Sequence, residues 1–247
     1  MADLRRPAPP TQQANAWIWQ GPGKLTAPIL MYHDFSVEDY DQRYTLPIAE
    51  FEAQMEWLAE NGYTTIPISL LVEALRFGAE LPPRPVVITF DDGWKSVYTE
   101  AFPIMQHYGF TGVTYLVSGT LGAPKVLNSE QLAEMIAAGW EIGSHSHTHL
   151  ALPHHHESAQ AEIRQSRFAL EDFLGLPVLT FAYPYGRSDE FTANKVFDSG
   201  YLAAVGLGDH CRQSKRNLYY LPRIEVRGTM SLEEFVAFMP WPEGSPQ

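Results

Sequence analysis

The run RPVVITF at residues 84–90 constrains the fold more than any other feature of the sequence. From Pro85 onward it is apolar at almost every position, so no polar face is left for water. Such a strand is typical of a parallel sheet that is covered on both faces. The run ends in Asp91, Asp92 and Gly93, although two adjacent carboxylates repel one another. A solvated Asp-Gly turn would explain this ending, and so would a metal site beside a catalytic carboxylate.

Strand-like and helix-like segments alternate along the chain. Short apolar or β-branched runs predict strands at 28–33, 63–68, 84–90, 112–117, 140–145, 177–184, 201–207 and 218–226. Helical spacing of apolar residues predicts helices at 49–63, 69–78, 98–109, 128–140, 157–175, 191–200 and 231–239. Asn128 and Gln131 have the spacing of a capping box. Seven or eight such units predict an α/β fold, a distorted or incomplete (β/α)7-8 barrel in a single domain, with a doubly wound sheet as the alternative.

Composition limits the classes of partner. The chain has 29 acidic and 17 basic residues and a formal charge of -12, so it lacks the basic surface of nucleic-acid or anionic-membrane binders. It contains no run of about 20 apolar residues that could span a membrane. Cys211 is the single cysteine, which excludes an intrachain disulfide. Nothing in the sequence fixes the oligomeric state, and a monomer agrees with all of it.

The two ends of the chain are predicted to be tails outside the folded domain. Residues 1–24 are polar and proline-rich and lack the apolar core of a signal peptide. We therefore expect a flexible tail at 1–24, one catalytic domain at 25–240 and a second flexible tail at 241–247.

Unusual polar residues follow four of the predicted strands. They form the groups Tyr32–Asp34, Asp91–Gly93, His145–His149 and Tyr183–Gly186. In a (β/α) barrel the catalytic groups gather where strands end and loops begin. Four groups on this edge would rarely arise by chance, and they favour an active site over a solvated turn.

A metal site explains two of these groups together. His145 and His149 are four residues apart, and neutral imidazole is a good zinc ligand. With one carboxylate added, such a set leaves coordination positions open for water and substrate. Adjacent strand residues point to opposite sides, so one aspartate can bind the metal while the other faces water or substrate. The run His154–His156 is predicted to be an exposed loop.

Three motifs resemble those of the polysaccharide deacetylases, carbohydrate esterase family four. They are TFDDG at 89–93, HSHTH at 145–149 and FAYPYG at 181–186, in the family's order. The likeness extends from about residue 28 to 226. The sequences MYH, YPYG and LPRIEV further resemble the subgroup that deacetylates poly-N-acetylglucosamine.

The resemblance implies a distorted (β/α) barrel and metal-assisted hydrolysis of acetyl groups on sugar polymers. Asp92, His145 and His149 would hold a divalent metal, zinc in the first place, with cobalt or nickel as alternatives. Asp91 would be the general base for the attacking water. The backbone N–H of Tyr185 would stabilise the oxyanion, together with the metal. Ser146 would hydrogen-bond within the ligand loop.

Two departures from the family pattern concern the base and the acid. Ala182 occupies the place of an arginine that orients the base, and the closing L-x-H motif that supplies the general acid is absent. His33 is our first candidate for the acid, against a buried histidine that is satisfied by backbone. His210 is a weaker candidate, and His107 is expected to be structural.

Sugar contacts are assigned to aromatic residues and one arginine. Trp94, Tyr183 and Tyr185 could stack on pyranose rings, with ordinary packing as the competing explanation. Arg223 is placed among the substrate-binding residues, and it could instead reach Asp91 in place of the missing arginine.

These observations favour a metal-dependent N-deacetylase of an N-acetylglucosamine-containing glycan. An O-acetyl esterase, as for acetylxylan, or a cyclic amide hydrolase would use the same site, and an ester would tolerate a missing acid better. A non-catalytic carbohydrate-binding domain is disfavoured by the intact metal ligands. The resemblance suggests a secreted or cell-envelope location, with the cytoplasm as the alternative because no signal peptide is seen.

Overall fold

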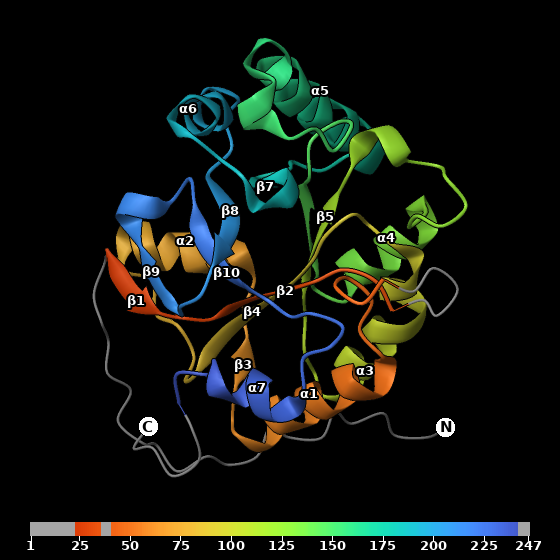
Figure 1. Cartoon of the computed structure of the whole chain (residues 1–247), viewed down its shortest axis with the longest axis vertical. Helices are drawn as coiled ribbons and strands as arrows, with labels where there is room; N and C mark the ends of the chain where they lie inside the picture. Colours follow the sequence, from red (N-terminus) through yellow and green to blue (C-terminus); the bar gives the residue numbers. More distant parts are fainter. Residues whose placement is uncertain (1–22, 36–40, 242–247) are drawn as a thin grey trace.

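A closed ring of parallel strands forms the centre of the molecule. The computed structural model describes residues 23–35 and 41–241. The ring contains β2 (Ile29–Tyr32), β4 (Pro85–Phe90), β5 (Val113–Leu116), β6 (Glu141–Ser144), β7 (Thr180–Ala182), β8 (Ala203–Gly208) and β10 (Leu221–Glu225). Their order is β2-β10-β8-β7-β6-β5-β4, and a β2–β4 pairing closes the ring (Figure 1). The predicted barrel is therefore confirmed, with seven strands, and the doubly wound sheet is wrong.

Strand β4 lies at the point of closure and is buried at every residue. Val86, Ile88 and Phe90 belong to the larger apolar cluster, whereas Val87 belongs to the second one. Alternate side chains of one strand thus enter two different cores, because successive residues point to opposite faces. This double burial accounts for the unbroken apolar run in the sequence.

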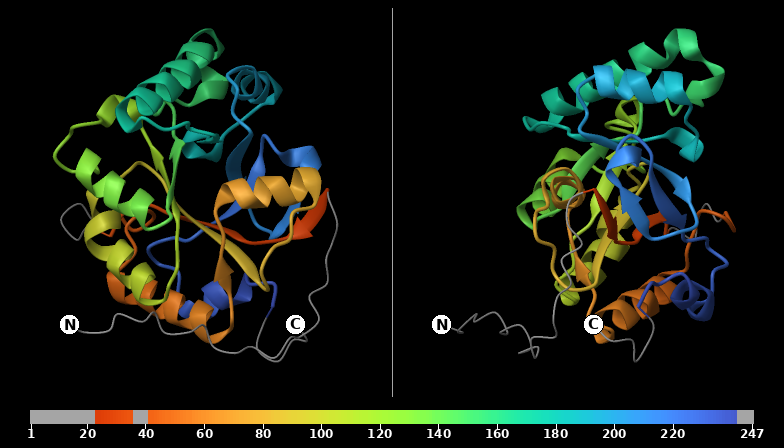
Figure 2. Two further views of the ribbon diagram at one scale, coloured as in Figure 1. Left: turned by 180° about the vertical axis from the view of Figure 1, so that it is seen from behind. Right: turned by 90° about the vertical axis from the view of Figure 1, so that its left-hand side faces the viewer.

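Helices cover the outside of the ring and close one of its ends. Around it lie α1 (Ile48–Glu60), α3 (Phe102–His107), α4 (Ser129–Ala137), α5 (His156–Leu174), α6 (Glu190–Asp198) and α7 (Leu232–Ala237) (Figures 1 and 2). The remaining helix, α2 (Ile68–Phe77), shares the second apolar cluster with Ile29, Val87 and Val113 of the strands. It therefore packs onto the inward-facing strand residues near the amino end of the barrel.

Several helix ends follow the signals in the sequence. Asn128 and Gln131 form the expected capping box at the start of α4. Gly78 and Gly175 adopt left-handed conformations directly after α2 and α5, where glycine has no steric penalty.

Three segments differ from the prediction. β1 (Lys24–Thr26) and β9 (Arg212–Ser214) form a small antiparallel sheet where no strand was predicted, because such short, mainly polar strands carry no periodic signal. The strand expected at 63–68 is reduced to β3 (Thr64–Thr65), which pairs with the start of β4. The helix expected at 98–109 begins as a π-helical turn at Val97–Ala101, next to Pro103, which lacks the N–H that a regular turn needs.

The predicted tails at 1–24 and 241–247 lie outside the described residues except at their inner ends, Gly23, Lys24 and Trp241. Within residues 23–35 and 41–241, no helix has the length and apolarity needed to cross a membrane.

We expect Asn128→Ala to lower the free energy of unfolding by about 1 kcal/mol, because the N–H of Gln131 loses the side chain that caps it. Asn128→Asp retains an acceptor and should remain close to the native value. Urea unfolding of both variants measures the difference, and equal losses would contradict the capping role.

Candidate active site and metal centre

Three side chains that could hold a metal ion, here called the candidate ligands, meet at the carboxyl end of the barrel. Asp92 follows β4, and His145 and His149 follow β6. The Asp92 Oδ1 atom lies 3.6 Å from His145 Nε2 and 3.5 Å from His149 Nε2. Ligand atoms held about 2.0–2.2 Å from a tetrahedral zinc ion lie about 3.3–3.6 Å apart. The residues present therefore fit a divalent metal with coordination positions left open.

Two hydrogen bonds orient these ligands. The Nδ1 atom of His145 lies 2.8 Å from the carbonyl oxygen of Ala182, which leaves Nε2 facing Asp92. The Trp94 indole N–H donates to Asp92 Oδ2 at 3.2 Å, so Oδ1 remains available to a metal. Partners of this kind fix the tautomer and direction of metal ligands. Burial and the neighbouring His145 lower the pKa of His149, which favours the neutral form that binds metals.

Backbone strain is concentrated at this site. Asp92, Ser146, His149 and Tyr185 all have positive φ, at 70°, 65°, 62° and 59°. Among the described residues that are not glycine, only Arg84 shares this conformation. It is costly for residues with a side chain and persists where surrounding contacts enforce it. The sharp turns aim the ligands toward one point, which a regular strand or helix would not do.

The ligand loop is held from two sides. The Ser146 hydroxyl accepts a hydrogen bond from the His149 backbone N–H at 3.0 Å, as expected from the sequence. On the other side, the buried Glu162 of α5 accepts from the backbone N–H groups of His147 and Thr148 at 3.0 and 2.8 Å. It also accepts from the Thr148 hydroxyl at 2.7 Å. One carboxylate thus satisfies two backbone donors between the two histidine ligands.

Asp91 forms a buried ion pair with Arg223 of β10. Two nitrogens of the guanidinium donate to the two carboxylate oxygens, each at 2.7 Å, and the arginine side chain is 0% exposed. The sequence-based expectation that Arg223 reaches Asp91 in place of the missing arginine agrees with this contact. Its assignment as a substrate-binding residue is wrong, because the guanidinium is fully buried and both of its terminal nitrogens donate to Asp91. It therefore cannot touch a ligand in the pocket.

The ion pair sets the protonation state of Asp91. Burial raises the pKa of this carboxyl group, but Arg223 and His145 outweigh burial and hold the pKa well below its ordinary range. The carboxylate is therefore ionised at neutral pH. Its Oδ2 atom lies 3.7 Å from His145 Nε2, directly beside the metal ligands.

A pocket of about 180 Å³ opens over these groups. Asp91, Asp92, His145 and His149 line it together with Met31, His33, Arg43, Tyr44, Tyr185, Gly186, Arg187, Leu207 and Glu225. Sequence analysis missed Arg43, Tyr44, Arg187 and Glu225, which lie in ordinary polar loop or strand-end patterns. Glu162 left a clearer signal, since it is a charged residue on the apolar face of α5 formed by Ala159, Ile163 and Leu170.

His33 lies in the pocket wall, with its ring 4.7 Å from that of Tyr44. Its buried Nδ1 atom has no hydrogen-bond partner among the described residues, so it is not a histidine satisfied by backbone. Burial lowers the pKa of His33, although the carboxylates of Asp91 and Asp92 oppose the shift.

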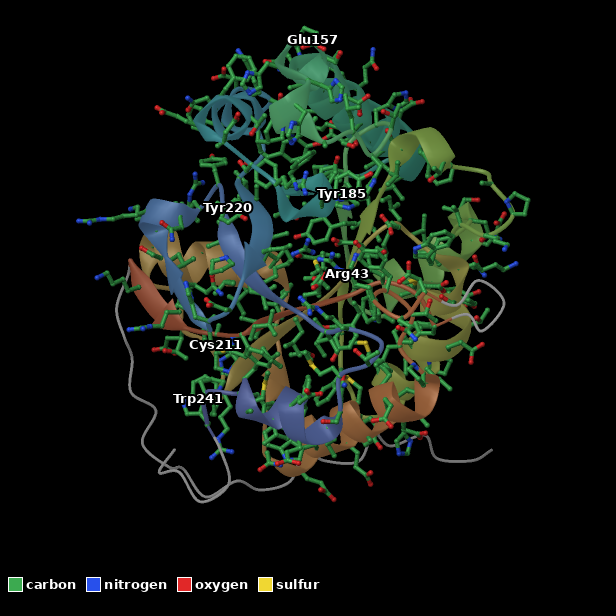
Figure 3. The ribbon with its side chains drawn as sticks, viewed as in Figure 1. Arg43, Glu157, Tyr185, Cys211, Tyr220 and Trp241 are labelled. Carbon is green, nitrogen blue, oxygen red and sulfur yellow. The ribbon has the colours of Figure 1, made fainter. Side chains whose placement is uncertain are left out.

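Tyr185 forms the outer edge of the pocket. Its side chain is 52% exposed, and its ring lies 4.6 Å from that of His149 (Figure 3). Within the described part of the chain, no group accepts a hydrogen bond from its backbone N–H. This donor is therefore available to a ligand.

Other residues singled out in the sequence lie elsewhere. Tyr183 is wrong as a sugar-stacking residue, because it is buried and its hydroxyl donates to the carbonyl of Tyr219. Trp94 is half-buried and supports Asp92 from outside the pocket lining. His107 ends α3, and neither it nor His210 lines the pocket. In the run His154–His156, the first and last residues are exposed, but His156 opens α5 and contacts Asp189.

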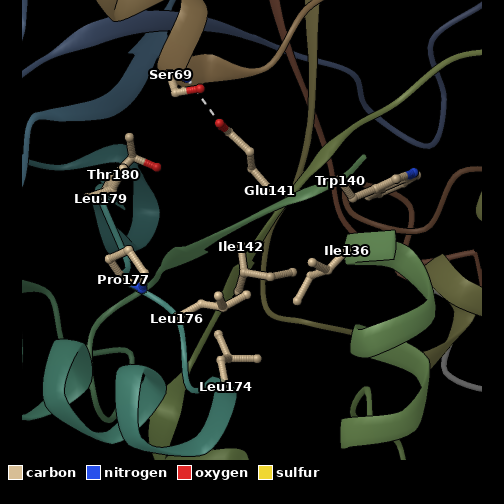
Figure 4. A pocket seen from close by; sticks show the side chains of 10 residues that line it. All are labelled: Ser69, Ile136, Trp140, Glu141, Ile142, Leu174, Leu176, Pro177, Leu179 and Thr180. Atoms are coloured by element: carbon tan, nitrogen blue, oxygen red, sulfur yellow. Dashed lines mark hydrogen bonds between the residues drawn. The ribbon is translucent and has the colours of Figure 1, made fainter. Parts of the chain in front are cut away.

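A second cavity, of about 210 Å³, is lined by residues of α4, by the first residues of β6 and by the segment between α5 and β7 (Figure 4). Glu141 and Thr180, the first residues of β6 and β7, line it with mainly apolar neighbours. Glu141 accepts a hydrogen bond from the Ser69 backbone N–H at the start of α2. The carboxylate thus supports the first turn of a helix whose N-cap residue, Pro67, offers no side-chain cap.

The sequence and the fold of this chain are similar to those of known proteins. The family model for polysaccharide deacetylase matches residues 78–204. The Bacillus subtilis protein YxkH, which carries the family's name, is 31% identical over 230 residues, covering 91% of this chain and 80% of that protein. A poly-beta-1,6-N-acetyl-D-glucosamine N-deacetylase of Staphylococcus aureus is 25% identical over 207 residues, covering 78% and 71%. The Streptococcus pyogenes deacetylase PplD, solved in complex with acetate, superposes with a TM-score of 0.79 at 25% identity, covering 87% of this chain and 98% of that one.

The buried ion pair gives a testable stability effect. Arg223→Met leaves Asp91 as an uncompensated buried charge and should cost about 3–5 kcal/mol. The double variant Arg223→Met/Asp91→Asn should recover part of that loss. Urea unfolding of chelated protein measures both, and simple addition of the single-variant losses would contradict the coupling.

The same pair predicts a pH dependence. Because the folded pKa of Asp91 lies below its unfolded value of about 4, the pair stabilises the fold fully above that pH. Its contribution should be lost as the pH falls below 4 toward the folded pKa. The double variant should show a smaller loss of stability over this acidic range.

Glu162→Ala should weaken metal binding by about 10–100-fold, the usual effect of removing a group that orients metal ligands. Glu162→Gln keeps an acceptor for the two N–H groups and should retain most of the affinity. Glu157→Ala, at an exposed glutamate of the same helix, is the matched control. Competition with a chromogenic chelator measures affinity without reference to activity. An unchanged metal affinity in Glu162→Ala would contradict the positioning role of Glu162.

Proposed function

The chain belongs to the polysaccharide deacetylase family, and on that premise we propose that it is a metal-dependent hydrolase of N-acetyl groups on an N-acetylglucosamine-containing glycan. One observation carries the proposal. An ionised carboxylate, Asp91, lies 3.7 Å from a metal-ligand histidine within an open pocket. This pairing of a base with an open metal site is what hydrolysis of an acetyl group requires.

Asp92, His145 and His149 would hold the metal. A divalent ion there would polarise the acetyl carbonyl and lower the pKa of a water molecule, and zinc suits two imidazoles and one carboxylate. Cobalt and nickel remain alternatives for the same ligand set.

Each residue around the metal would have its own role in the reaction. Asp91 would accept the proton of the attacking water while Arg223 holds its carboxylate in place. The Tyr185 N–H would donate to the oxygen that becomes negative as water adds to the carbonyl. The C–N bond then breaks, and the departing amine needs a proton, for which His33 is the candidate donor. The products are acetate and a free amino sugar.

The substrate assignment draws on the relatives. The Staphylococcus aureus relative is named for poly-beta-1,6-N-acetyl-D-glucosamine, and PplD was solved with acetate. A glycan of this class would place the reaction outside the cytoplasm, at the cell envelope or beyond it.

An O-acetyl ester is the second candidate substrate, and the lowered pKa of His33 favours it. A histidine that is mainly unprotonated at pH 7 seldom carries the proton that an amine leaving group needs. An alkoxide leaving from an ester needs less help from such an acid.

We expect metal-reconstituted protein to release acetate from β-1,6-linked N-acetylglucosamine oligomers. Asp91→Asn should lower kcat by about 10²–10⁴, the contribution of a general base, with its metal content unchanged by mass spectrometry. Chelation should abolish the activity, and Asp172→Asn, at an exposed aspartate, serves as the control.

Release from acetyl esters alone would replace the amide substrate by an ester. No acetate from any acetylated sugar, with stoichiometric metal bound, would overturn the hydrolase itself.

A further inference from the structure

A larger cavity adjoins the catalytic pocket. Its volume is about 920 Å³, compared with about 180 Å³ for the pocket over the metal ligands. The two share Arg43, Leu207 and Glu225, so the larger one begins where the pocket ends. It extends from the carboxyl ends of β8 and β10 to α7, on the rim of the barrel that carries the metal ligands.

An ion cluster forms the boundary between the two cavities. Glu225, whose side chain is 10% exposed, accepts hydrogen bonds from Arg43 at 2.9 Å and from Arg227 at 2.8 Å. The two arginine side chains are 49% and 60% exposed. Each keeps guanidinium N–H groups with no acceptor among the described residues. The carboxylate thus holds two arginines at the boundary between the cavities.

Apolar side chains form part of the lining of the larger cavity, together with the polar residues Asp209, Thr229 and Glu234. Leu207, Ile224, Met230 and the exposed ring of Phe238 contribute to its lining. A pyranose ring has apolar C–H faces and hydroxyl groups around its edge. An apolar surface with a few fixed polar groups is the usual composition of a small-molecule site and matches such a ring.

Backbone contacts join the two loops at this boundary. The Gly228 backbone N–H donates to the Arg43 carbonyl at 3.2 Å, which joins the loop after β10 to the loop before α1. A Cβ at Gly228 would collide with the carbonyl oxygen of Thr45, so the two loops are in direct contact. Arg43 also lies over the Tyr44 ring, 5.2 Å from its centroid (Figure 3 labels Arg43).

We propose that the larger cavity is a binding site for the sugar units next to the one being deacetylated, with Arg43 and Arg227 donating to their oxygens and Phe238 and Met230 contacting their ring faces. This inference rests on the proposed function, since it takes an acetylated glycan as the ligand. It adds that the polymer leaves the pocket toward α7 and that chain length governs affinity.

The test uses β-1,6-linked N-acetylglucosamine oligomers of two and six units, with the intact protein. Titration calorimetry on metal-free protein measures binding, and acetate release by metal-reconstituted protein is measured separately. Arg227→Ala removes a charged residue and Phe238→Ala an apolar residue of the cavity lining, and neither residue lines the catalytic pocket. Arg216→Ala, at an exposed arginine outside both cavities, is the matched control.

We expect the hexamer to bind at least about tenfold more tightly than the dimer, and each cavity variant to reduce that ratio by about tenfold. Arg216→Ala should keep the native ratio. Equal affinity for the two lengths, or equal losses for both in the cavity variants, would overturn the proposal. Length-dependent binding without acetate release would refute the proposed reaction and leave the glycan site standing.

Discussion

Closure of the parallel sheet between β2 and β4 is the constraint on which the rest of the structure depends. It places the carboxyl ends of all seven strands on one rim, so residues far apart in the sequence meet there. Asp91 follows β4, His145 follows β6, and Arg223 lies within β10. The site is a property of the ring, because no single βα unit contains both Asp91 and its counter-ion, Arg223.

The site is held by satisfied polar groups. Three buried or half-buried residues hold the candidate site in place. Trp94 donates to Asp92, Glu162 accepts from the loop between His145 and His149, and Arg223 donates to Asp91. They compensate for left-handed backbone at Asp92, Ser146 and His149. Strained ligands supported in this way are arranged before a metal arrives, so little reorganisation is needed on binding.

Sequence reasoning recovered the features that depend on local pattern. The apolar run at 84–90 predicted a doubly covered strand, and the capping box at Asn128 predicted the start of α4. The candidate ligands were found because His145 and His149 stand in one short motif. The predictions that were wrong or missing concern contacts between residues that are far apart in the sequence. Burial decided that Tyr183 faces the core and that Arg223 is enclosed, while Glu162 enters the site only through the docking of α5.

The position of Arg223 in the sequence has a consequence for folding during synthesis. This arginine lies 132 residues after Asp91, on the last strand of the ring. A chain emerging from the ribosome therefore contains its buried aspartate long before the counter-ion exists. Until β10 inserts between β2 and β8, burying Asp91 would be costly, so the reactive rim should stay open to water. We therefore expect the barrel to be completed and the Asp91–Arg223 pair to form in the same step.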